Sequence, residues 1–597
     1  MDEDHLFIAS AAAPALILIF IVLYLRREIV PSISVSLEED ETNQEQYDPI
    51  KHKATKNKIP CYDPGLMTYL GNMPADNADQ VKEKIIKGKA AAEVWKTASF
   101  QKRKLLLKTL LKYILHNQEA ICRVASIDSG KPLVDAAFGE VMVTCEKIAW
   151  LTREGEKYLR PERRSSGAMM FYKAARVEYH PVGVVGAIVP WNYPFHNVFN
   201  PLTAALFAGN GLVIKVSEHA SWSSQYYGRI ISAALQAVGA PADLVQIVTG
   251  YAEAGNALVT GGVDKVIFVG STGVGRAVLS AAATNLTPVV LELGGKDAFI
   301  VCDDADLSQA VPTALRGAFQ SCGQNCAGAE RFLVQASVYE RFVDAAVGVA
   351  RQLRQGPALG NSPVDCGAMC MPGLAEKVAQ LVEEAVADGA KVLVGGHLVR
   401  HESGGQFYAP TVLVGVTPAM RIWREEVFGP VMVIVQFKDD DEAVRLANDC
   451  PFGLGSAVFS RSQRRANAIG RLLEAGMTSI NDFATTYMCQ SLPFGGVKES
   501  GFDRFAGIEG LRGLCVPKAV CEDRFPWLMR TDIPPLLQYP VGDAAFPFVC
   551  GLISMFYGLS LRDNLSGLCT VISCFLGGGK KAGKRKANRQ EGRPQVS

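Results

Sequence analysis

The sequence carries almost no net charge and lacks the cysteine patterns of a metal site or a disulfide framework. Its 61 Lys and Arg residues against 60 Asp and Glu residues give a net charge of +1, which argues against a protein that coats nucleic acid. The 15 cysteines are scattered from Cys61 to Cys574, with no CxxC pair and no zinc-ligand spacing. We therefore expect no metal site, no nucleic-acid partner, and reduced cysteines in a chain facing the cytosol.

Internal repeats are also lacking, which excludes a solenoid or a propeller built from repeats. Hydrophobic residues make up 48% of the chain and charged residues 20%, so core-building material is plentiful and wholesale disorder is excluded. At about 150 residues per domain, the 597 residues predict roughly four domain-sized units.

The N-terminus contains the longest uncharged apolar run, from Leu6 to Leu25. Twenty helical residues reach about 30 Å, the thickness of the hydrocarbon core. The run follows acidic residues and ends at Arg26 and Arg27, which predicts a transmembrane anchor with those arginines in the cytoplasm. A cleaved signal peptide and a buried soluble helix remain the alternatives. The polar, acidic stretch from Leu37 to Asp48 reads as a linker.

The C-terminus contains a second apolar segment, from Ala544 to Leu561, which includes Pro547, Gly551 and Gly558 and is interrupted by Arg562-Asp563-Asn564. It resumes from Leu568 to Leu576 and is followed by a basic tail that includes Lys580 and Lys584. One membrane crossing, two short crossings, an interfacial segment, and docking on the protein itself are all compatible with this pattern.

The body of the chain alternates between strand-like and helix-like segments, which predicts βαβ units, parallel sheets, and two successive α/β domains. Apolar spacing predicts helices, and short β-branched runs predict strands. The expected helices are Ala78–Ala98, Phe100–Asp128, Ser221–Val238 and Ala375–Ala387, and the expected strands are Val182–Val189, Leu212–Val216, Leu244–Thr249, Val266–Val269 and Val431–Phe437.

Two segments could bind a nucleotide. The strand ending at Val269 runs through Gly270, Ser271 and Gly275 into a helix. The free N–H groups of that helix would suit a pyrophosphate, but this segment taken alone favours a structural turn. Lys215 and Glu218 follow another strand end, where ligands bind in parallel sheets. A carboxylate there can accept both ribose hydroxyls and repel a 2′-phosphate, which favours NAD over NADP; the alternative is a surface ion pair.

Three further segments could carry out acyl chemistry. The segment Gln320–Gly328 places two cysteines among small residues, and a thiolate is the best side-chain nucleophile near neutral pH. Glu292 lies between leucines at a strand end, and apolar surroundings raise a carboxyl pKa toward that of a general base. Asn192 could donate to an oxyanion, or it could be a turn residue between two prolines.

Together these segments resemble, in this order along the fold, those of the NAD(P)-dependent aldehyde dehydrogenase superfamily. The resemblance covers about Tyr62 to Arg524 and includes three further motifs: EEVFGP from Glu425, NDCPFGL from Asn448, and PFGGVKESG from Pro493. The apolar N-terminal run and the basic tail are similar to those of the membrane-associated plant branch sometimes called family 22.

The resemblance implies a role for each matched residue. Cys326 is the nucleophile, Glu292 activates the deacylating water, and Asn192 with the Cys326 amide binds the oxyanion. The residues implied to contact NAD are Val189, Trp191, Lys215, Glu218, Gly270, Ser271, Gly275, Glu426 and Phe428. Those implied to border the aldehyde are Tyr193, His196, Asn325 and Phe494. His196, Asn197, Asn200 and Asn325 are polar where the family is often apolar, which hints at a polar aldehyde.

The resemblance also implies a division of the chain and its assembly. It predicts a protruding hairpin from Met169 to Val185 and a terminal strand from Leu511 to Val520 that pair between subunits in a homodimer or homotetramer. The expected parts are a transmembrane anchor (1–30), an acidic linker (31–61), an NAD-binding domain (62–166 and 183–291), an oligomerisation element (167–182 and 500–524), a catalytic domain (292–499), an apolar segment (544–577) and a basic tail (578–597).

We therefore expect an NAD-dependent oxidation of an aldehyde to a carboxylic acid through a cysteine thiohemiacetal and a thioester. The enzyme would be tethered by its N-terminal helix to the lipid of the endoplasmic reticulum or another endomembrane, with its body in the cytosol. The alternative localisation is the secretory pathway after signal cleavage. The alternative functions are a relative that passes the acyl group to CoA or phosphate, which usually lacks a carboxylate at the Glu292 position, and an inactive membrane scaffold of the same fold.

Overall fold

The computed structural model describes residues 29–36, 45–360 and 362–585. The expected membrane anchor, part of the acidic linker and the end of the basic tail lie outside these residues. Within the described ranges, no helix combines the length and the apolar composition that a bilayer crossing requires. The chain divides into two compact units. The first contains the described residues up to Leu159 together with His180–Val516, and the second contains Arg160–Tyr179 and the chain from Pro517 onward.

The first sheet of the larger unit has six strands in the order β21-β9-β8-β5-β6-β7. All neighbouring pairs are parallel except β21 with β9. Strand residues such as Val213 and Phe268 pack against Val81 of α2 and Leu258 of α10 in one apolar core. The elements are β5 (Val184–Ile188), β6 (Gly211–Lys215), β7 (Val245–Val248), β8 (Lys265–Val269), β9 (Val289–Glu292), β21 (Gly501–Phe502), α2 (Ala78–Trp95), α10 (Ala252–Thr260) and α11 (Thr272–Ala283).

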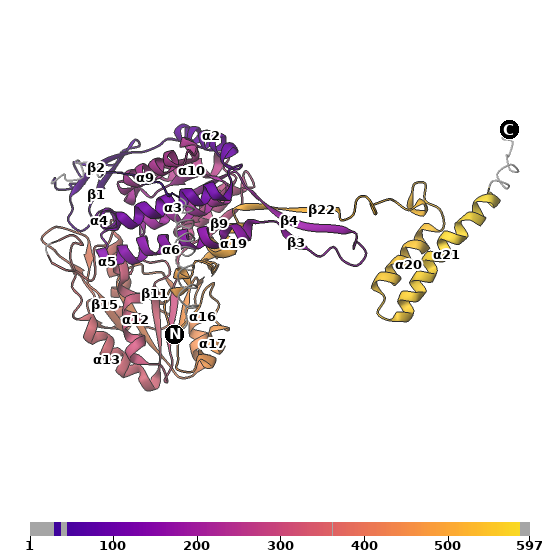
Figure 1. Ribbon diagram of the computed structural model, residues 1–597. Coiled ribbons are helices and arrows are strands. Elements are labelled where there is room, and N and C mark those ends of the chain that lie inside the picture. Colours follow the sequence, from indigo (N-terminus) through magenta and orange to yellow (C-terminus); the bar gives the residue numbers. More distant parts are fainter. Residues whose placement is uncertain (1–28, 37–44, 361, 586–597) are drawn as a thin grey trace, which may run out of the picture. The chain divides into compact units, whose positions relative to one another are not determined.

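The second sheet has seven strands in the order β12-β15-β16-β11-β10-β18-β19, and only the edge strand β12 is antiparallel. Successive residues of a strand face opposite sides, so Phe299 packs in the core with α12 and α13, and Ile300 in the core with α14, α16 and α17. Figure 1 shows α12 and α13 on one side of β11, and α16 and α17 on the other. The expected α/β fold with two successive sheets is confirmed. The strands are β10 (Asp297–Val301), β11 (Ala329–Gln335), β12 (Lys391–Val394), β15 (Thr411–Val414), β16 (Val431–Phe437), β18 (Ser456–Phe459) and β19 (Ser479–Ile480), and the helices are α12 (Leu307–Phe319), α13 (Tyr339–Ala350), α14 (Leu374–Ala387), α16 (Asp440–Asn448) and α17 (Gln463–Gly470).

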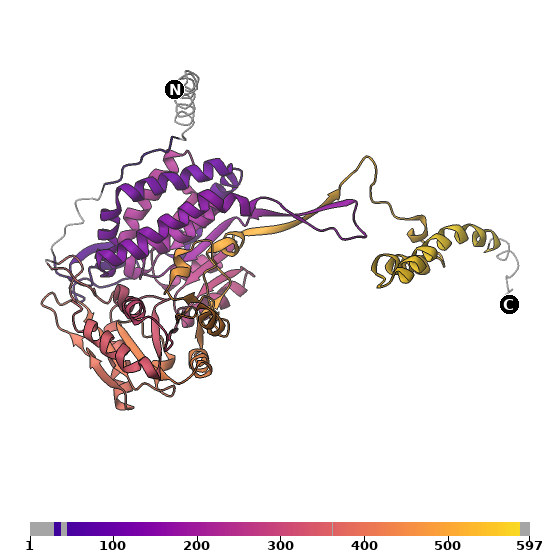
Figure 2. The same ribbon diagram turned by 60° about the horizontal axis from the view of Figure 1, so that its bottom comes forward.

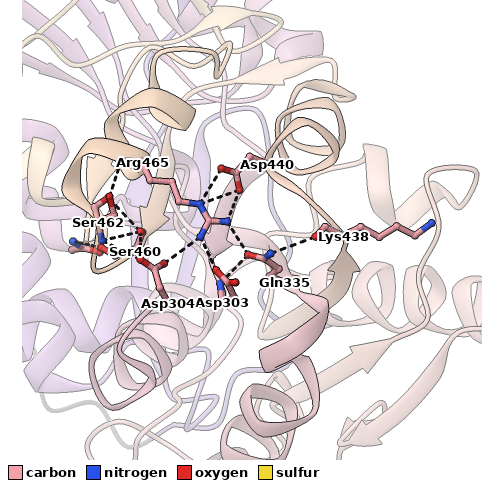
Figure 3. A network of polar contacts seen from close by, with 9 residues as sticks. Asp303, Asp304, Gln335, Lys438, Asp440, Ser460, Ser462 and Arg465 are labelled. Carbon is pink, nitrogen blue, oxygen red and sulfur yellow. Dashed lines mark hydrogen bonds and ion pairs between the residues drawn. The ribbon is translucent and has the colours of Figure 1, made fainter.

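The carboxyl edge of the second sheet is occupied by a network of ion pairs around Arg465 of α17 (Figure 3). The guanidinium donates to Asp440 and Asp303, each at 2.6 Å, and to Gln335 at 3.0 Å. Asp440 follows β16, Asp303 follows β10, and Gln335 is the last residue of β11. A ligand crevice usually lies at such an edge, but here protein side chains pair with one another across it. Residues that precede β11 lie at the opposite edge.

The helices that precede the first sheet differ from the expected pattern. The helix expected over Phe100–Asp128 is two helices, α3 (Phe100–His116) and α4 (Gln118–Ser129), because Asn117 leaves helical geometry. Its side-chain amide donates to the Tyr113 carbonyl at 2.8 Å, a competing hydrogen bond typical of asparagine. The next helical stretch, from α5 (Leu133–Ala136) to α7 (Glu156–Leu159), alternates with π-helical turns on either side of α6 (Val143–Trp150). Periodicity did not predict it.

The smaller unit contains a three-stranded sheet in the order β22-β4-β3 and two C-terminal helices. Its elements are β3 (Glu162–Arg164), β4 (Lys173–Pro181), β22 (Cys515–Asp523), α20 (Ala545–Tyr557) and α21 (Leu561–Arg585). The expected oligomerisation element began at residue 500, but Gly501 and Phe502 pair with β9 of the larger unit. Within the expected range 500–524, only β22 (Cys515–Asp523) joins the sheet of β4.

Candidate active site

The loop that carries Cys326 lies between α12 and β11 and begins in an unusual backbone conformation. Ser321, Cys322 and Gly323 have φ values of 52°, 57° and 70°, a left-handed region that costs free energy for residues with a Cβ. A Cβ at Gly323 would lie 2.1 Å from the Gly429 carbonyl oxygen. The buried Asp135 fixes the loop by accepting a hydrogen bond from the Ser321 amide at 2.8 Å. The tertiary structure thus imposes the backbone that presents Cys326.

Glu292 ends β9, and it faces the same cavity as Cys326. Its two carboxylate oxygens are buried, and neither accepts a well-formed hydrogen bond from a described residue. Burial raises the pKa of Glu292 to about 7, and the Cys326 thiol and the Gly294 amide offset only part of this effect. Near neutral pH this carboxyl group is therefore divided between its two forms, as a general base requires.

Cys326 is half-buried. Burial, followed by the Glu292 carboxylate, raises the pKa of the Cys326 thiol well above its ordinary value. The thiol is therefore protonated at neutral pH in this state, and Glu292 is the nearby group with a suitable pKa to accept its proton.

Asn192 lies between β5 and α8 (Pro194–Ala208), where its amide is held in one orientation. The side-chain nitrogen donates to the Gln324 carbonyl at 3.1 Å, and the side-chain oxygen accepts from Asn197 at 3.3 Å. The nitrogen therefore faces the cysteine loop, and its second N–H has no hydrogen-bond partner among the described residues. The backbone oxygen of Asn192 accepts from Lys131 at 2.5 Å, and Lys131 also binds the buried Glu140 at 2.5 Å.

Asn192, Glu292 and Cys326 line one cavity of about 440 Å³. Its volume lies in the range of small-molecule sites. Tyr193, His196, Asn325 and Phe494, all predicted from the sequence, also line it. Its apolar lining includes Phe138, Val143, Phe483, Met488, Phe494 and Phe505.

The polar groups on the inner wall of the cavity are engaged with the protein. His196 contacts the Thr144 hydroxyl through Nδ1 at 2.9 Å and the Tyr487 hydroxyl through Nε2. The Asn200 side-chain oxygen accepts from the buried Lys147. Burial lowers the pKa of His196 to about 3, which leaves the ring neutral. The hint of a polar aldehyde from these side chains is weakened, because their hydrogen-bonding atoms are already used.

The residues predicted to bind NAD lie around the carboxyl edge of the first sheet. Lys215 ends β6, and its ammonium lies 3.2 Å from a carboxylate oxygen of Glu218. Burial raises the pKa of Glu218, but the Lys215 ammonium and neighbouring groups overcome this effect and hold it below the ordinary value. Glu218 is therefore ionised at neutral pH and available to accept hydroxyl hydrogen bonds.

Gly270 and Ser271 connect β8 to the N-terminus of α11. Ser271 is exposed, and its side chain makes no capping hydrogen bond with the helix. The first N–H groups of α11 therefore lack this common partner. At Gly275 a Cβ would lie 2.3 Å from the Leu293 side chain, so glycine is required for close packing at this turn. These features fit a pyrophosphate.

The remaining predicted cofactor residues lie near the catalytic cavity. Val189 lines it. Trp191 and Phe428 form an edge-to-face pair with ring centroids 5.5 Å apart. The Glu426 carboxylate accepts from the Gly295 amide at 3.1 Å, three residues beyond Glu292. The structure thus places one group of cofactor candidates at the carboxyl edge of the first sheet and the other group near the catalytic cavity.

Three residues of this site were not found from the sequence. Lys131, between α4 and α5, donates to the Asn192 backbone and to Glu140, but isolated charges in the sequence give no signal of burial. Tyr487 lies in the loop from Asp482 to Leu492 that was expected to border the aldehyde, although nothing in the sequence distinguished this tyrosine from its neighbours.

Comparison with known proteins identifies relatives over most of the chain. Residues 51–520 match the aldehyde dehydrogenase family. An aldehyde dehydrogenase-like protein of Saccharomyces cerevisiae is 42% identical over 532 residues, which cover 86% of this chain and 82% of that protein. An aldehyde dehydrogenase-like protein of Schizosaccharomyces pombe is 40% identical over 514 residues, which cover 85% of this chain and 98% of that protein. The crystal structure of Staphylococcus aureus betaine aldehyde dehydrogenase in complex with NAD+ is similar to this chain, with a TM-score of 0.73 and 28% sequence identity. The match covers 81% of this chain and 94% of that one.

Proposed function

The chain belongs to the aldehyde dehydrogenase family, and on that premise we propose that it oxidises an apolar aldehyde to a carboxylic acid at a membrane, with NAD preferred over NADP. As a member of this family it is an oxidoreductase that uses a nicotinamide dinucleotide. The observation that carries the proposal is that Cys326, Glu292 and Asn192 line one cavity.

The chemistry proceeds on the Cys326 sulfur. The sulfur bonds to the aldehyde carbon as the thiol proton passes to Glu292, which releases it to solvent, so the carbonyl oxygen becomes an oxyanion. The Asn192 amide and the Cys326 N–H stabilise the negative charge that develops on that oxygen. When bound, the nicotinamide dinucleotide supplies the acceptor for the hydride that leaves the carbon. Glu292 then takes a proton from water as the water oxygen attacks the thioester, the C–S bond breaks, and the carboxylic acid departs.

The preference for NAD rests on Glu218. Its ionised carboxylate, paired with Lys215 at 3.2 Å, can accept hydrogen bonds from two ribose hydroxyls and would repel a 2′-phosphate. The S. aureus structure named above was solved with NAD+. Glu218→Ser should narrow the ratio of kcat/KM for NAD over NADP by about tenfold or more, whereas a Glu218 that only pairs with Lys215 would leave the ratio unchanged.

The preference for an apolar aldehyde rests on the lining of the cavity. Aromatic and aliphatic side chains predominate, and His196 and Asn200 direct their polar atoms to protein partners. Beside His196 and Asn200, an aldehyde with a charged end would have to break one of these hydrogen bonds or remain unpaired, at a cost of about 1–3 kcal/mol. Besides Glu292, the charged residues of the lining are Arg316, Asp482 and Arg504.

The membrane location rests on the sequence of Leu6–Leu25 and on the arginines that follow it. We infer an N-terminal anchor in an endomembrane with the catalytic body in the cytosol, and a place in the membrane-associated family 22 branch. A tether would suit aldehydes released from lipid. In intact microsomes treated with protease, protection of the N-terminus and digestion of the rest of the chain would support this orientation. Removal of the N-terminal run during synthesis would contradict the anchor.

An oligomer is proposed from the sheet of the smaller unit. β22 has one neighbour in that sheet, β4, and six of its nine residues are exposed. A long unpaired strand edge is a ready surface for pairing, so we infer a homodimer or homotetramer formed through this sheet. Sedimentation of the full chain as a monomer at micromolar concentration would contradict it.

The function is tested by following NADH formation with the full-length protein. The panel contains hexanal, hexadecanal and betaine aldehyde, each with NAD or NADP and with or without added CoA. We expect the apolar aldehydes to exceed betaine aldehyde by about tenfold or more in kcat/KM, and Cys326→Ala to abolish turnover. A requirement for CoA would favour an acyl-transferring enzyme, and no oxidation of any aldehyde would favour a scaffold.

A further inference from the structure

The two C-terminal helices form a closely packed antiparallel hairpin. Three residues, 558–560, join α20 to α21, and both views show the helices side by side (Figure 1 and Figure 2). Gly551 and Gly567 allow the backbones to approach, since a Cβ at Gly567 would lie 2.3 Å from the Met555 nitrogen. Asn564 closes the turn by donating to the Met555 carbonyl at 3.0 Å. The hairpin is therefore a defined structure.

Each helix of this hairpin presents an apolar stripe to the exterior. On α20, Phe546, Val549, Ile553 and Tyr557 recur at helical spacing with exposed fractions of 37–77%. On α21 the spacing of four, three, four and three residues places five exposed apolar side chains on one face. These are Leu561, Leu565, Leu568, Ile572 and Phe575. The exposed Ser566 and Ser573 of the same helix lie outside this stripe. Such stripes indicate a binding surface.

The charges around the hairpin indicate the chemistry of its partner. No charged residue occurs from Ala544 to Leu561. The sequence from Asn564 to Arg589 contains no acidic residue, but it contains six basic ones: Lys580, Lys581, Lys584, Arg585, Lys586 and Arg589. A partner that is apolar in one layer and anionic in the adjacent layer matches both features, as an anionic lipid surface does.

The length of the helices determines how such a surface could be met. The 13 residues of α20 reach about 20 Å, less than the roughly 30 Å of the hydrocarbon core, and no described helix is suited to a crossing. Helix-pairing seams are usually flanked by complementary charges, whereas the neighbours of these stripes are mainly uncharged. The hairpin therefore fits the plane of the interface better than a bilayer crossing or a helical partner.

We propose that the α20–α21 hairpin is a membrane-interface element that lies in the headgroup region of an anionic bilayer. The apolar stripes contact the acyl chains, and the basic sequence that follows contacts the headgroups. The segment 527–541 that precedes α20 adds exposed apolar side chains, among them Trp527 and Tyr539, which are residues enriched at membrane interfaces. This contact is distinct from the N-terminal anchor and does not depend on the catalytic proposal.

The test follows amide hydrogen exchange in the full-length protein reconstituted in phosphatidylcholine vesicles, with and without about 30% phosphatidylserine. The N-terminal run is present in both samples, so only the hairpin should report the lipid difference. We expect peptides covering residues 561–576 to exchange about tenfold more slowly with phosphatidylserine. Equal exchange in both vesicles and in lipid-free protein overturns the proposal.

Two double variants separate the apolar stripe from the rest of the helix. Leu565→Glu with Ile572→Glu should abolish the lipid-dependent slowing. Ser566→Glu with Ser573→Glu adds the same charge to the same helix outside the stripe and should retain most of it. All four side chains are exposed, so both variants should fold and keep wild-type aldehyde oxidation. Slowing that is independent of lipid but depends on protein concentration would identify a second copy of the chain as the partner and overturn the proposal.

Discussion

Replacing Glu292 by glutamine tests the electrostatics of the site through stability as well as through activity. The buried carboxylate lacks a well-formed hydrogen bond among the described residues, and burial raises its pKa from 4.5 to about 7. Between these pH values the folded protein binds more protons at Glu292 than the unfolded chain does. The contribution of this group to stability therefore falls as the pH rises from about 4.5 to 7, and the full penalty is present above pH 7.

The size of this penalty follows from the shift in pKa. At about 1.4 kcal/mol for each tenfold change in the ionisation constant, the rise from 4.5 to about 7 corresponds to about 3 kcal/mol. Glutamine does not ionise, so the variant lacks the pH-dependent penalty. Its own unpaired amide costs about 1–3 kcal/mol at every pH. The stability difference between variant and wild type should therefore change by about 3 kcal/mol across this pH window.

Urea unfolding of both proteins from pH 4.5 to 8 measures this difference. Glu253→Gln, on the exposed side of α10, controls for the loss of one carboxylate elsewhere. In parallel, the deacylation rate of the wild type should rise through about pH 7 as Glu292 loses its proton, and the Glu292→Gln variant should be slow at every pH. A stability difference that does not change with pH would refute the assignment of Glu292 as a destabilised, unpaired base.

Three other substitutions test separate parts of the account. Asn192→Ala should lower kcat by about 10²–10³ with unchanged folding by circular dichroism; a normal kcat would exclude Asn192 as an oxyanion donor. Lys147→Met should be more stable than the wild type by about 2 kcal/mol at pH 7, because burial lowers the pKa of Lys147 to about 7. This advantage should shrink toward pH 10.5, as the lysine of the unfolded chain also loses its proton. A difference in urea midpoints that is the same at every pH would contradict this prediction. Gly323→Ala should destabilise the protein by about 2–4 kcal/mol and slow the alkylation of the active-site cysteine, because the added Cβ meets the Gly429 carbonyl. Gly348→Ala in α13, where nothing lies within 4 Å of the added Cβ, should stabilise slightly, so a similar loss in both alanine variants would argue against a specific clash.

The elements that the sequence predicted well are those in which one local pattern dominates. Val431–Phe437 is a β-branched run, and its strand has the same bounds in the structure. The expected strand Leu212–Val216 is displaced by one residue, as β6. Such central strands are buried on both faces, so their composition alone distinguishes them. The residues that surround Cys326 and Glu292 were predicted from chemistry at strand ends, together with the family resemblance.

The elements that the sequence did not predict depend on contacts between distant segments. The break at Asn117 depends on a side-chain hydrogen bond that competes with the helix. The orientation of the Asn192 side chain depends on the Gln324 carbonyl, 132 residues later. The polar character of His196 suggested a polar aldehyde until its partners, Thr144 and Tyr487, were visible. Burial and pairing of a polar residue are properties of the fold and leave little trace in local sequence.

The central claim, that Cys326 forms the thioester during aldehyde oxidation, is tested most directly by trapping that intermediate. The wild-type protein is used, because formation of the thioester itself needs Glu292 as the base. It is mixed with NAD and the aldehyde that the activity panel selects, quenched with acid before one turnover is complete, then digested and analysed by mass spectrometry. The account predicts that the peptide containing Cys326 gains the mass of the aldehyde less two hydrogen atoms, and that Cys326→Ala shows no such gain. An acyl adduct on another cysteine, or oxidation of the aldehyde by the Cys326→Ala protein, would contradict the account.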